Sequence, residues 1–215
     1  MTISMLSATT IHRALIKRYP KAVCPLKYKT PWQLVVAVQL SAQCTDARVN
    51  LVTPDLFRAL PTVQAFAKAR QETVEQLIYS TGFYRNKSKN LIGAAQLITA
   101  EHAGKIPKTM PELLALPGIA RKTANVILSE LFQQNDGVVV DTHVGRLARR
   151  MGLTKHKDPV KVEQDLMQLL PQKDWRAFSL RLVFFGREIC DARKPRCTEC
   201  PIKKICPRAG LSPLK

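Results

Sequence analysis

The sequence predicts an all-α fold of two helical lobes with a cleft, and three observations support this. Apolar residues recur at helical spacing along most of the 215-residue chain. Alternating strand patterns are scarce, and no internal repeat or low-complexity linker interrupts the chain. Apolar residues make up 46% of the chain, which is enough for a sizeable core and argues against a disordered protein.

Five helices are predicted in the first half of the chain. The first ends before Pro20, and the second opens at Pro31, because proline suits the first turn of a helix. The stretch that follows, Leu34 to Val38, is apolar all round, which predicts a central buried helix. The predicted ranges are 8–18, 31–43, 46–57, 72–79 and about 86–102.

Five more helices are predicted in the second half. A short helix over 111–116 ends at Pro117-Gly118, and the next begins at once and covers 121–132. Asp141 is a good N-cap for a helix over 142–151. Asp158 caps the next helix, which is predicted to run to residue 170. The last long helix is predicted over 175–189.

Charge is the first indication of function. Lysine and arginine number 34 against 16 acidic residues, which is a formal net charge of +18. Nucleic acid is the usual partner of so basic a chain, because neutralised phosphates release their counterions. An anionic membrane surface and a merely basic protein surface are the alternatives, although no apolar run reaches the ~20 residues of a membrane helix.

The N-terminal segment is basic and contains no acidic residue before Asp46. Such a start is typical of an organelle transit peptide. However, Ile11, Leu15 and Ile16 lie at helical spacing and predict a packed surface helix equally well.

Four of the six cysteines crowd the C-terminus, whereas Cys24 and Cys44 stand alone. Because no secretory signal is visible, metal binding is favoured over disulfides. Zinc sites of four cysteines usually contain two separated C-x2-C pairs, so one compact run favours a [4Fe-4S] cluster over zinc. The run is C-x6-C-x2-C-x5-C and consists of Cys190, Cys197, Cys200 and Cys206.

Basic side chains surround this run. A cluster that ties basic loops together would form a rigid phosphate-binding surface. A purely structural staple for the C-terminal tail explains the cysteines equally well. The basic residues are Arg193, Lys194, Arg196, Lys203, Lys204 and Arg208.

Residues 116–124, Leu-Pro-Gly-Ile-Ala-Arg-Lys-Thr-Ala, predict two helices that meet through a Pro-Gly turn. The free N–H groups at the start of the second helix are a phosphate site that reads no base. Gly118 would allow a DNA backbone to approach closely. Ordinary helix–turn–helix packing explains the turn alone just as well.

Lys122 lies in the first turn of that helix beside Arg121, where the helix dipole and the neighbouring cation disfavour the protonated amine. A neutral lysine is a nucleophile that can form a Schiff base, although phosphate contact is the commoner role of such a lysine. About twenty residues later, Asp141 follows an apolar run. Asp141 is either a helix cap alone or a carboxylate that takes a proton and stabilises positive charge on a sugar.

Together these segments resemble the endonuclease III family of DNA glycosylases over nearly the whole chain. The resemblance rests on residues 116–125 (LPGIARKTAN), 140–143 (VDTH), 40–46 (LSAQCTD) and the cysteine run. It implies a six-helix barrel lobe over residues 24–134 and a second lobe of residues 1–23 and 135–215 that carries a [4Fe-4S] cluster. Because the family begins with a helix, it also argues against a transit peptide. It implies a monomer in the bacterial cytoplasm, associated with the nucleoid.

The resemblance further implies base excision repair of duplex DNA that carries a damaged base or an abasic site. The family's substrates are oxidised pyrimidines such as thymine glycol, and the damaged nucleotide is flipped into a pocket between the lobes. Lys122 would attack the sugar C1′ and expel the base. The Schiff base would then allow β-elimination 3′ to the lesion, and Asp141 would assist the proton transfers.

Five further residues are implied to contact DNA. Gln43 matches the residue that fills the gap left by the flipped base, and Phe83 falls where the family often has a leucine wedge. The other three belong to the hairpin and are Gly118, Ala120 and Arg121.

Departures from the family's pattern bear on substrate range and rate. Ala120 replaces the second glycine of the usual hairpin, which would be costly if that position needs a positive φ. Phe83 is larger than leucine, Cys44 replaces a usual alanine, and Gly145 lies where a bulkier residue is usual.

Three alternatives accompany the bifunctional glycosylase and lyase. An adenine glycosylase of the same superfamily lacks the hairpin lysine and carries an extra C-terminal domain. A non-catalytic or weakly active iron–sulfur DNA-binding protein would keep the hairpin and the cluster. The third is a basic nucleic-acid adaptor protein whose four cysteines bind a structural zinc ion. The presence of both Lys122 and Asp141 favours the enzyme.

Overall fold

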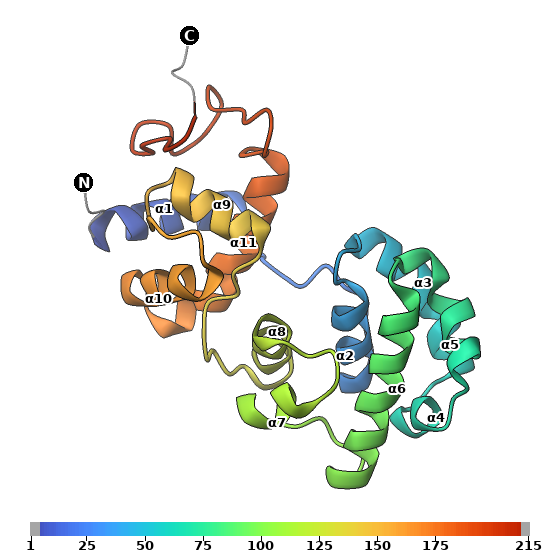
Figure 1. Ribbon diagram of the computed structural model, residues 1–215. Helices are drawn as coiled ribbons and strands as arrows, with labels where there is room; N and C mark the ends of the chain where they lie inside the picture. Colours follow the sequence, from blue (N-terminus) through green and yellow to red (C-terminus); the bar gives the residue numbers. More distant parts are fainter. Residues whose placement is uncertain (1–4, 212–215) are drawn as a thin grey trace. The chain divides into compact units, whose positions relative to one another are not determined.

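The structure is a computed structural model that describes residues 5–211 (Figure 1). Within this range it contains eleven α-helices, two short 3₁₀ helices and no strand, which confirms the all-α prediction. The chain forms two compact units. The middle unit is Cys24–Gln134, and the terminal unit joins the described residues up to Val23 to those from Asn135 onward.

The middle unit is built around α2 (Pro31–Leu40), which Figure 1 shows between α8 and α6. Leu34, Val35 and Val36 are fully buried, so the predicted central helix is confirmed. The Trp32 ring packs edge-on against Phe66, with 5.2 Å between the ring centroids. The other helices of this unit are α3 (Asp46–Ala59), α4 (Val63–Ala67), α5 (Gln71–Ile78), η1 (Tyr79–Thr81), α6 (Tyr84–Glu101), α7 (Met110–Ala115) and α8 (Arg121–Phe132).

Several helix ends in this unit differ from the predictions, most of all the end of α2. The prediction that the second helix extends to residue 43 is wrong, because α2 ends at Leu40 and Gln43 has a φ of 52°. In contrast, α6 begins at Tyr84, two residues earlier than predicted. The five-residue α4 was not predicted, since so short a helix has no periodicity of its own. It forms because Thr62 caps it and Phe66 is buried.

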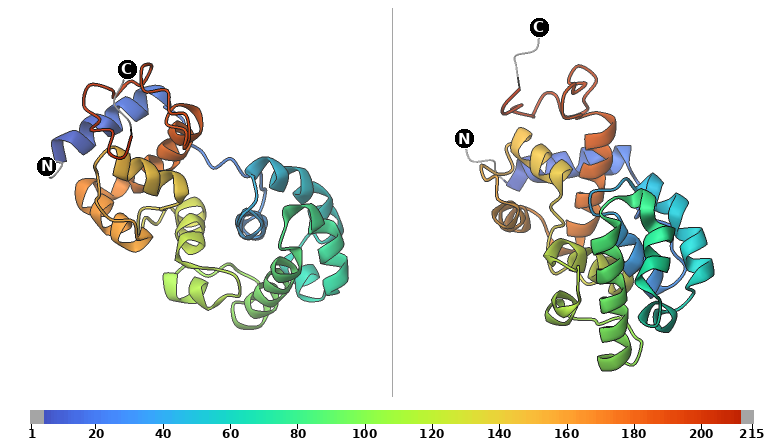
Figure 2. Two further views of the ribbon diagram at one scale, coloured as in Figure 1. Left: turned by 45° about the horizontal axis from the view of Figure 1, so that its top comes forward. Right: turned by 45° about the vertical axis from the view of Figure 1, so that its right-hand side comes forward.

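The terminal unit packs α1 (Met5–Arg18) and α9 (Thr142–Arg150) against α10 (Pro159–Leu169) and α11 (Trp175–Glu188). Its core contains Leu15, Leu147 and Phe178, each fully buried. The short η2 (Gln172–Asp174) leads into α11. The loop after α11, drawn in red in Figure 2, lies against the end of α9, where Arg150 Nη2 donates to the Ala192 carbonyl at 2.7 Å.

Two caps that the sequence predicts are present. The Asp158 carboxylate accepts a hydrogen bond from Lys161 N at 3.0 Å, and α10 begins at the next residue, Pro159. The Asp141 carboxylate caps α9 in the same way. In residues 5–211 no helix has the length and apolar content needed to cross a membrane.

Candidate functional site

The hairpin between α7 and α8 is a tight turn that needs a glycine. Ile119 N donates to the Leu116 carbonyl at 3.2 Å, and Gly118 has a φ of 76°. With Pro117 before Gly118, this is the pattern of a type II turn, whose third residue takes a positive φ. A Cβ at residue 118 would lie 2.8 Å from Asn90 Cβ. The left-handed backbone and the lack of space therefore both select glycine here.

Ala120, in contrast, occupies an ordinary conformation. Its φ of −92° and ψ of 168° are extended backbone that any residue adopts. The absence of a second glycine therefore causes no backbone strain in this hairpin.

Ala120 is also the N-cap of α8, and Arg121 and Lys122 are exposed in the first turn. The N-cap side chain, the Ala120 methyl, makes no capping hydrogen bond. The positive end of the α8 dipole thus coincides with two cationic side chains. The arrangement suits an anion such as a phosphate.

Asp141 lies in the terminal unit, at the N-terminus of α9. Its Oδ1 accepts a hydrogen bond from Val144 N at 2.8 Å, and its Oδ2 lies 3.2 Å from His143 Nδ1. The His143 ring packs beside Gly186 of α11, where an added Cβ would lie 3.2 Å from His143 Cδ2. Two contacts therefore orient the carboxylate.

His143 was not singled out from the sequence. Its position two residues after a capping aspartate was the available signal, since such a side chain can turn back to the carboxylate. Lys122 belongs to the middle unit and Asp141 to the terminal unit.

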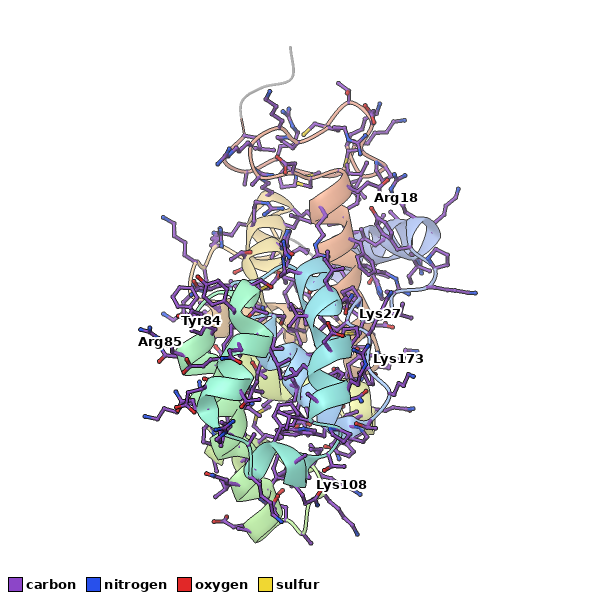
Figure 3. The ribbon with its side chains drawn as sticks, turned by 90° about the vertical axis from the view of Figure 1, so that its right-hand side faces the viewer. Arg18, Lys27, Tyr84, Arg85, Lys108 and Lys173 are labelled. Carbon is purple, nitrogen blue, oxygen red and sulfur yellow. The ribbon has the colours of Figure 1, made fainter. Side chains whose placement is uncertain are left out.

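Gln43 and Phe83 are exposed in two loops of the middle unit, and both have a left-handed backbone. Phe83, with a φ of 50° and 62% of its surface exposed, is the N-cap of α6. For non-glycine residues such conformations cost of order 1–3 kcal/mol and cluster at functional sites. Figure 3 shows Tyr84 and Arg85 at the start of α6, where the Arg85 guanidinium lies 5.7 Å from the Tyr84 ring centroid.

The four C-terminal cysteines line one hollow of the terminal unit, about 380 Å³ including space open to solvent. None of the four forms a disulfide, and burial raises the pKa of Cys200 and of Cys206. Within residues 5–211, no group of three or more His, Cys, Asp or Glu side chains is arranged to hold a single metal ion. All four cysteines therefore share one hollow.

Arg150, from the end of α9, fastens the start of the cysteine loop. Its Nη1 lies 3.5 Å from the Cys190 Sγ and donates to the Asp191 carbonyl at 2.6 Å. The Arg150 carbonyl in turn lies 3.5 Å from the Cys206 Sγ. One residue thus contacts both ends of the cysteine run.

Comparisons with known proteins agree with this fold and these motifs. Residues 36–172 match the family model described as HhH-GPD superfamily base excision DNA repair protein. That match defines the class of protein, a base excision DNA repair protein with a helix-hairpin-helix.

Individual relatives identify the family within this class. The chain is 54% identical over 205 residues to the endonuclease III of Synechocystis sp., covering 95% of this chain and 94% of that protein. It matches the solved structure of a non-covalent endonuclease III–DNA complex with a TM-score of 0.91 and 37% identity, over 96% of each chain. A trapped endonuclease III–DNA covalent intermediate matches with the same score and identity, over 96% of this chain and 97% of that one. The chain therefore belongs to the endonuclease III family of base excision DNA glycosylases and abasic-site lyases.

Proposed function

We propose that this chain removes oxidised pyrimidines from duplex DNA and then cuts the strand at the abasic site, with Lys122 as the attacking amine. The observation that carries the proposal is the exposed Lys122 in the first turn of α8, on a hairpin built around Gly118. DNA phosphate bound at this N-terminus would hold the sugar near the amine.

The reaction begins with the neutral Nζ of Lys122. Its lone pair forms a bond to the sugar C1′, and the bond between C1′ and the base breaks, so that the base leaves with the electron pair and takes up a proton. The sugar ring then opens and leaves a C1′=N Schiff base. Loss of a C2′ proton expels the 3′ phosphate by β-elimination, and water finally releases the lysine.

Asp141 would serve the proton transfers and stabilise the positive charge that develops on the sugar. Its orientation supports this role, because Val144 N and His143 leave the carboxylate little freedom to turn. Gln43 and Phe83 would enter the duplex where the damaged nucleotide leaves it. Gly118, Ala120 and Arg121 would contact the phosphate backbone through the hairpin.

The cysteine hollow would hold a [4Fe-4S] cluster through Cys190, Cys197, Cys200 and Cys206. Four cysteines that line one hollow supply the number and kind of ligands that such a cluster takes. When bound, the cluster would tie the basic loop to Arg150. Under this proposal the middle unit is the hairpin lobe and the terminal unit is the cluster lobe of a monomer that acts on the bacterial chromosome.

Borohydride trapping on duplex DNA that carries thymine glycol or an abasic site tests the nucleophile. Hydride reduces the Schiff base to a stable amine, so the wild type should give a covalent protein–DNA adduct. Lys122→Ala should give none. Lys161→Ala is the matched control, because Lys161 is also exposed in the first turn of a helix and should trap normally.

Equal trapping by Lys122→Ala and the wild type would show that another residue attacks. No adduct from the wild type on either lesion would favour the non-catalytic DNA-binding protein instead. Broad visible absorbance of the purified protein would identify an iron–sulfur cluster, and its absence with bound zinc would contradict the cluster assignment.

A further inference from the structure

One buried lysine contacts the two loops that carry Gln43 and Phe83. Lys87 lies in the first turn of α6 with 7% of its surface exposed. Its Nζ donates to the Leu40 carbonyl at 2.8 Å and to the Thr81 carbonyl at 2.9 Å. Leu40 ends α2 three residues before Gln43, and Thr81 ends η1 two residues before Phe83.

The C-terminus of α2 depends on this contact. A helix leaves its last four carbonyls without partners of its own. Ser41 and Ala42 supply partners for three of them, and Lys87 supplies the fourth, on Leu40. Since α2 has no basic residue in its own last turn, Lys87 is also the cation that complements the helix dipole.

The Phe83 loop is held from both sides. The Thr81 side chain is buried, and its hydroxyl donates to the Ile78 carbonyl at 2.8 Å. The backbone N of Lys87 donates to the Phe83 carbonyl at 3.0 Å, while its Nζ reaches back to Thr81. Lys87 therefore contacts the chain before and after Gly82.

A buried ammonium is costly unless it is hydrogen-bonded. Burial lowers the pKa of Lys87, and the nearby Cys44 thiol, next to Gln43, acts in the opposite direction. Both loops also contain a strained residue, with a φ of 52° at Gln43 and 50° at Phe83. Strained backbones persist only where their surroundings hold them, and Lys87 is a contact that both loops share.

We propose that Lys87 is a positioning residue that holds the Gln43 and Phe83 loops in register, so that both side chains enter the duplex as one unit. The proposal rests on the proposed function, in which these two residues occupy the opened duplex. Because one ammonium serves both backbones, displacement of either loop weakens the support of the other. Lys87 itself is buried and would touch no DNA.

The test compares Lys87→Met with Lys89→Met. Methionine keeps most of the length of the side chain and removes its donors. Lys89 is exposed on the same helix, so its substitution removes the same charge without the two contacts. Hydrogen exchange should speed up in both loops, residues 41–45 and 79–83, in Lys87→Met alone.

Activity supplies a readout that a general loss of stability would not produce. Cleavage of duplex DNA with an abasic site should fall on the order of 10- to 100-fold in Lys87→Met, the scale of a displacement of about 1 Å. Borohydride trapping on single-stranded abasic DNA, where no gap is filled, should fall much less. Lys87→Arg keeps several donors and should recover most of the duplex activity.

Faster exchange in only one loop, or in neither, would overturn the proposal. So would an equal fall on duplex and single-stranded DNA, or the same result from Lys89→Met. If Lys87→Met does not fold, Lys87→Gln, which keeps an N–H donor on a shorter side chain, is judged by the same two comparisons. Wild-type protein that traps no DNA would refute the proposed function instead, and the exchange data would still decide whether Lys87 couples the loops.

Discussion

At the scale of single residues, Asp141 is the N-cap of α9 and the proposed catalytic carboxylate, and these two roles can be tested separately. As the N-cap of α9 it needs only an acceptor oxygen, whereas proton transfer and charge stabilisation need a carboxylate. Asparagine supplies the first property and lacks the second. Substitution at this one position can therefore distinguish a cap from a catalytic group.

We predict that Asp141→Asn lowers kcat/KM for base removal by about 10²- to 10⁴-fold, because a positioned acid or base contributes about that much. The free energy of unfolding should change by less than about 1 kcal/mol, since asparagine caps helices as well as aspartate does. Single-turnover kinetics and chemical denaturation measure the two effects separately.

Asp158→Asn is the matched control, since Asp158 caps α10 by the same hydrogen bond. It should leave both kinetics and stability near the wild-type values. Full activity in Asp141→Asn would reduce Asp141 to a helix cap.

At the scale of elements, Gly118 and Ala120 of the hairpin differ in what their backbone conformations require, although the family pattern has glycine at both positions. Gly118 has a φ of 76° and no space for a Cβ, whereas Ala120 has an extended backbone. The family pattern alone does not distinguish a glycine needed for conformation from one that can be replaced. The backbone angles make that distinction.

We predict that Gly118→Ala destabilises the protein by about 1–3 kcal/mol, the cost of a left-handed backbone in a residue with a Cβ. It should also weaken binding to duplex DNA, because Asn90 must move and the turn with it. Urea denaturation and a DNA-binding titration measure the two effects.

The paired variant Ala120→Gly should cost at most about 1 kcal/mol, through backbone entropy alone. A larger cost for Ala120→Gly than for Gly118→Ala would contradict a left-handed backbone at residue 118 beside an extended one at residue 120. Gain of DNA affinity in Ala120→Gly would show instead that the alanine methyl obstructs the phosphate.

At the scale of the whole molecule, the net charge of +18 is the feature that concerns DNA most directly. Such a charge attracts any duplex, damaged or not, and the specific contacts then act at the lesion.

We predict that affinity for undamaged duplex falls linearly with salt concentration on logarithmic axes, with a slope of about −0.9 for each phosphate neutralised. Lys122→Ala should reduce the slope by about one at most, because it removes one charge among many. Fluorescence anisotropy between about 50 and 200 mM salt is the measurement. A flat dependence would contradict a phosphate-based interface.

Much of the fold was predictable because its signals are local. Periodicity, prolines and capping side chains act within a few residues, so α2, α8, α10 and α11 were predicted with small errors at their ends. The α2 end at Leu40 was missed because Ser41, Ala42 and a lysine from another helix terminate it. The short α4 was missed because its stability comes from packing.

The sequence by itself determined the helical class, the basic charge, the cysteine run and the hairpin around Gly118 and Lys122, since each depends on composition or on near neighbours. Only the tertiary structure decided that Ala120 is unstrained, that His143 and Val144 orient Asp141, that Arg150 contacts the cysteine loop and that Lys87 joins two loops. The physical reason is the separation along the chain between the residues that are in contact. Leu40 and Lys87 lie 47 residues apart in the chain. Their contact depends on how buried helices pack together, which no local pattern specifies.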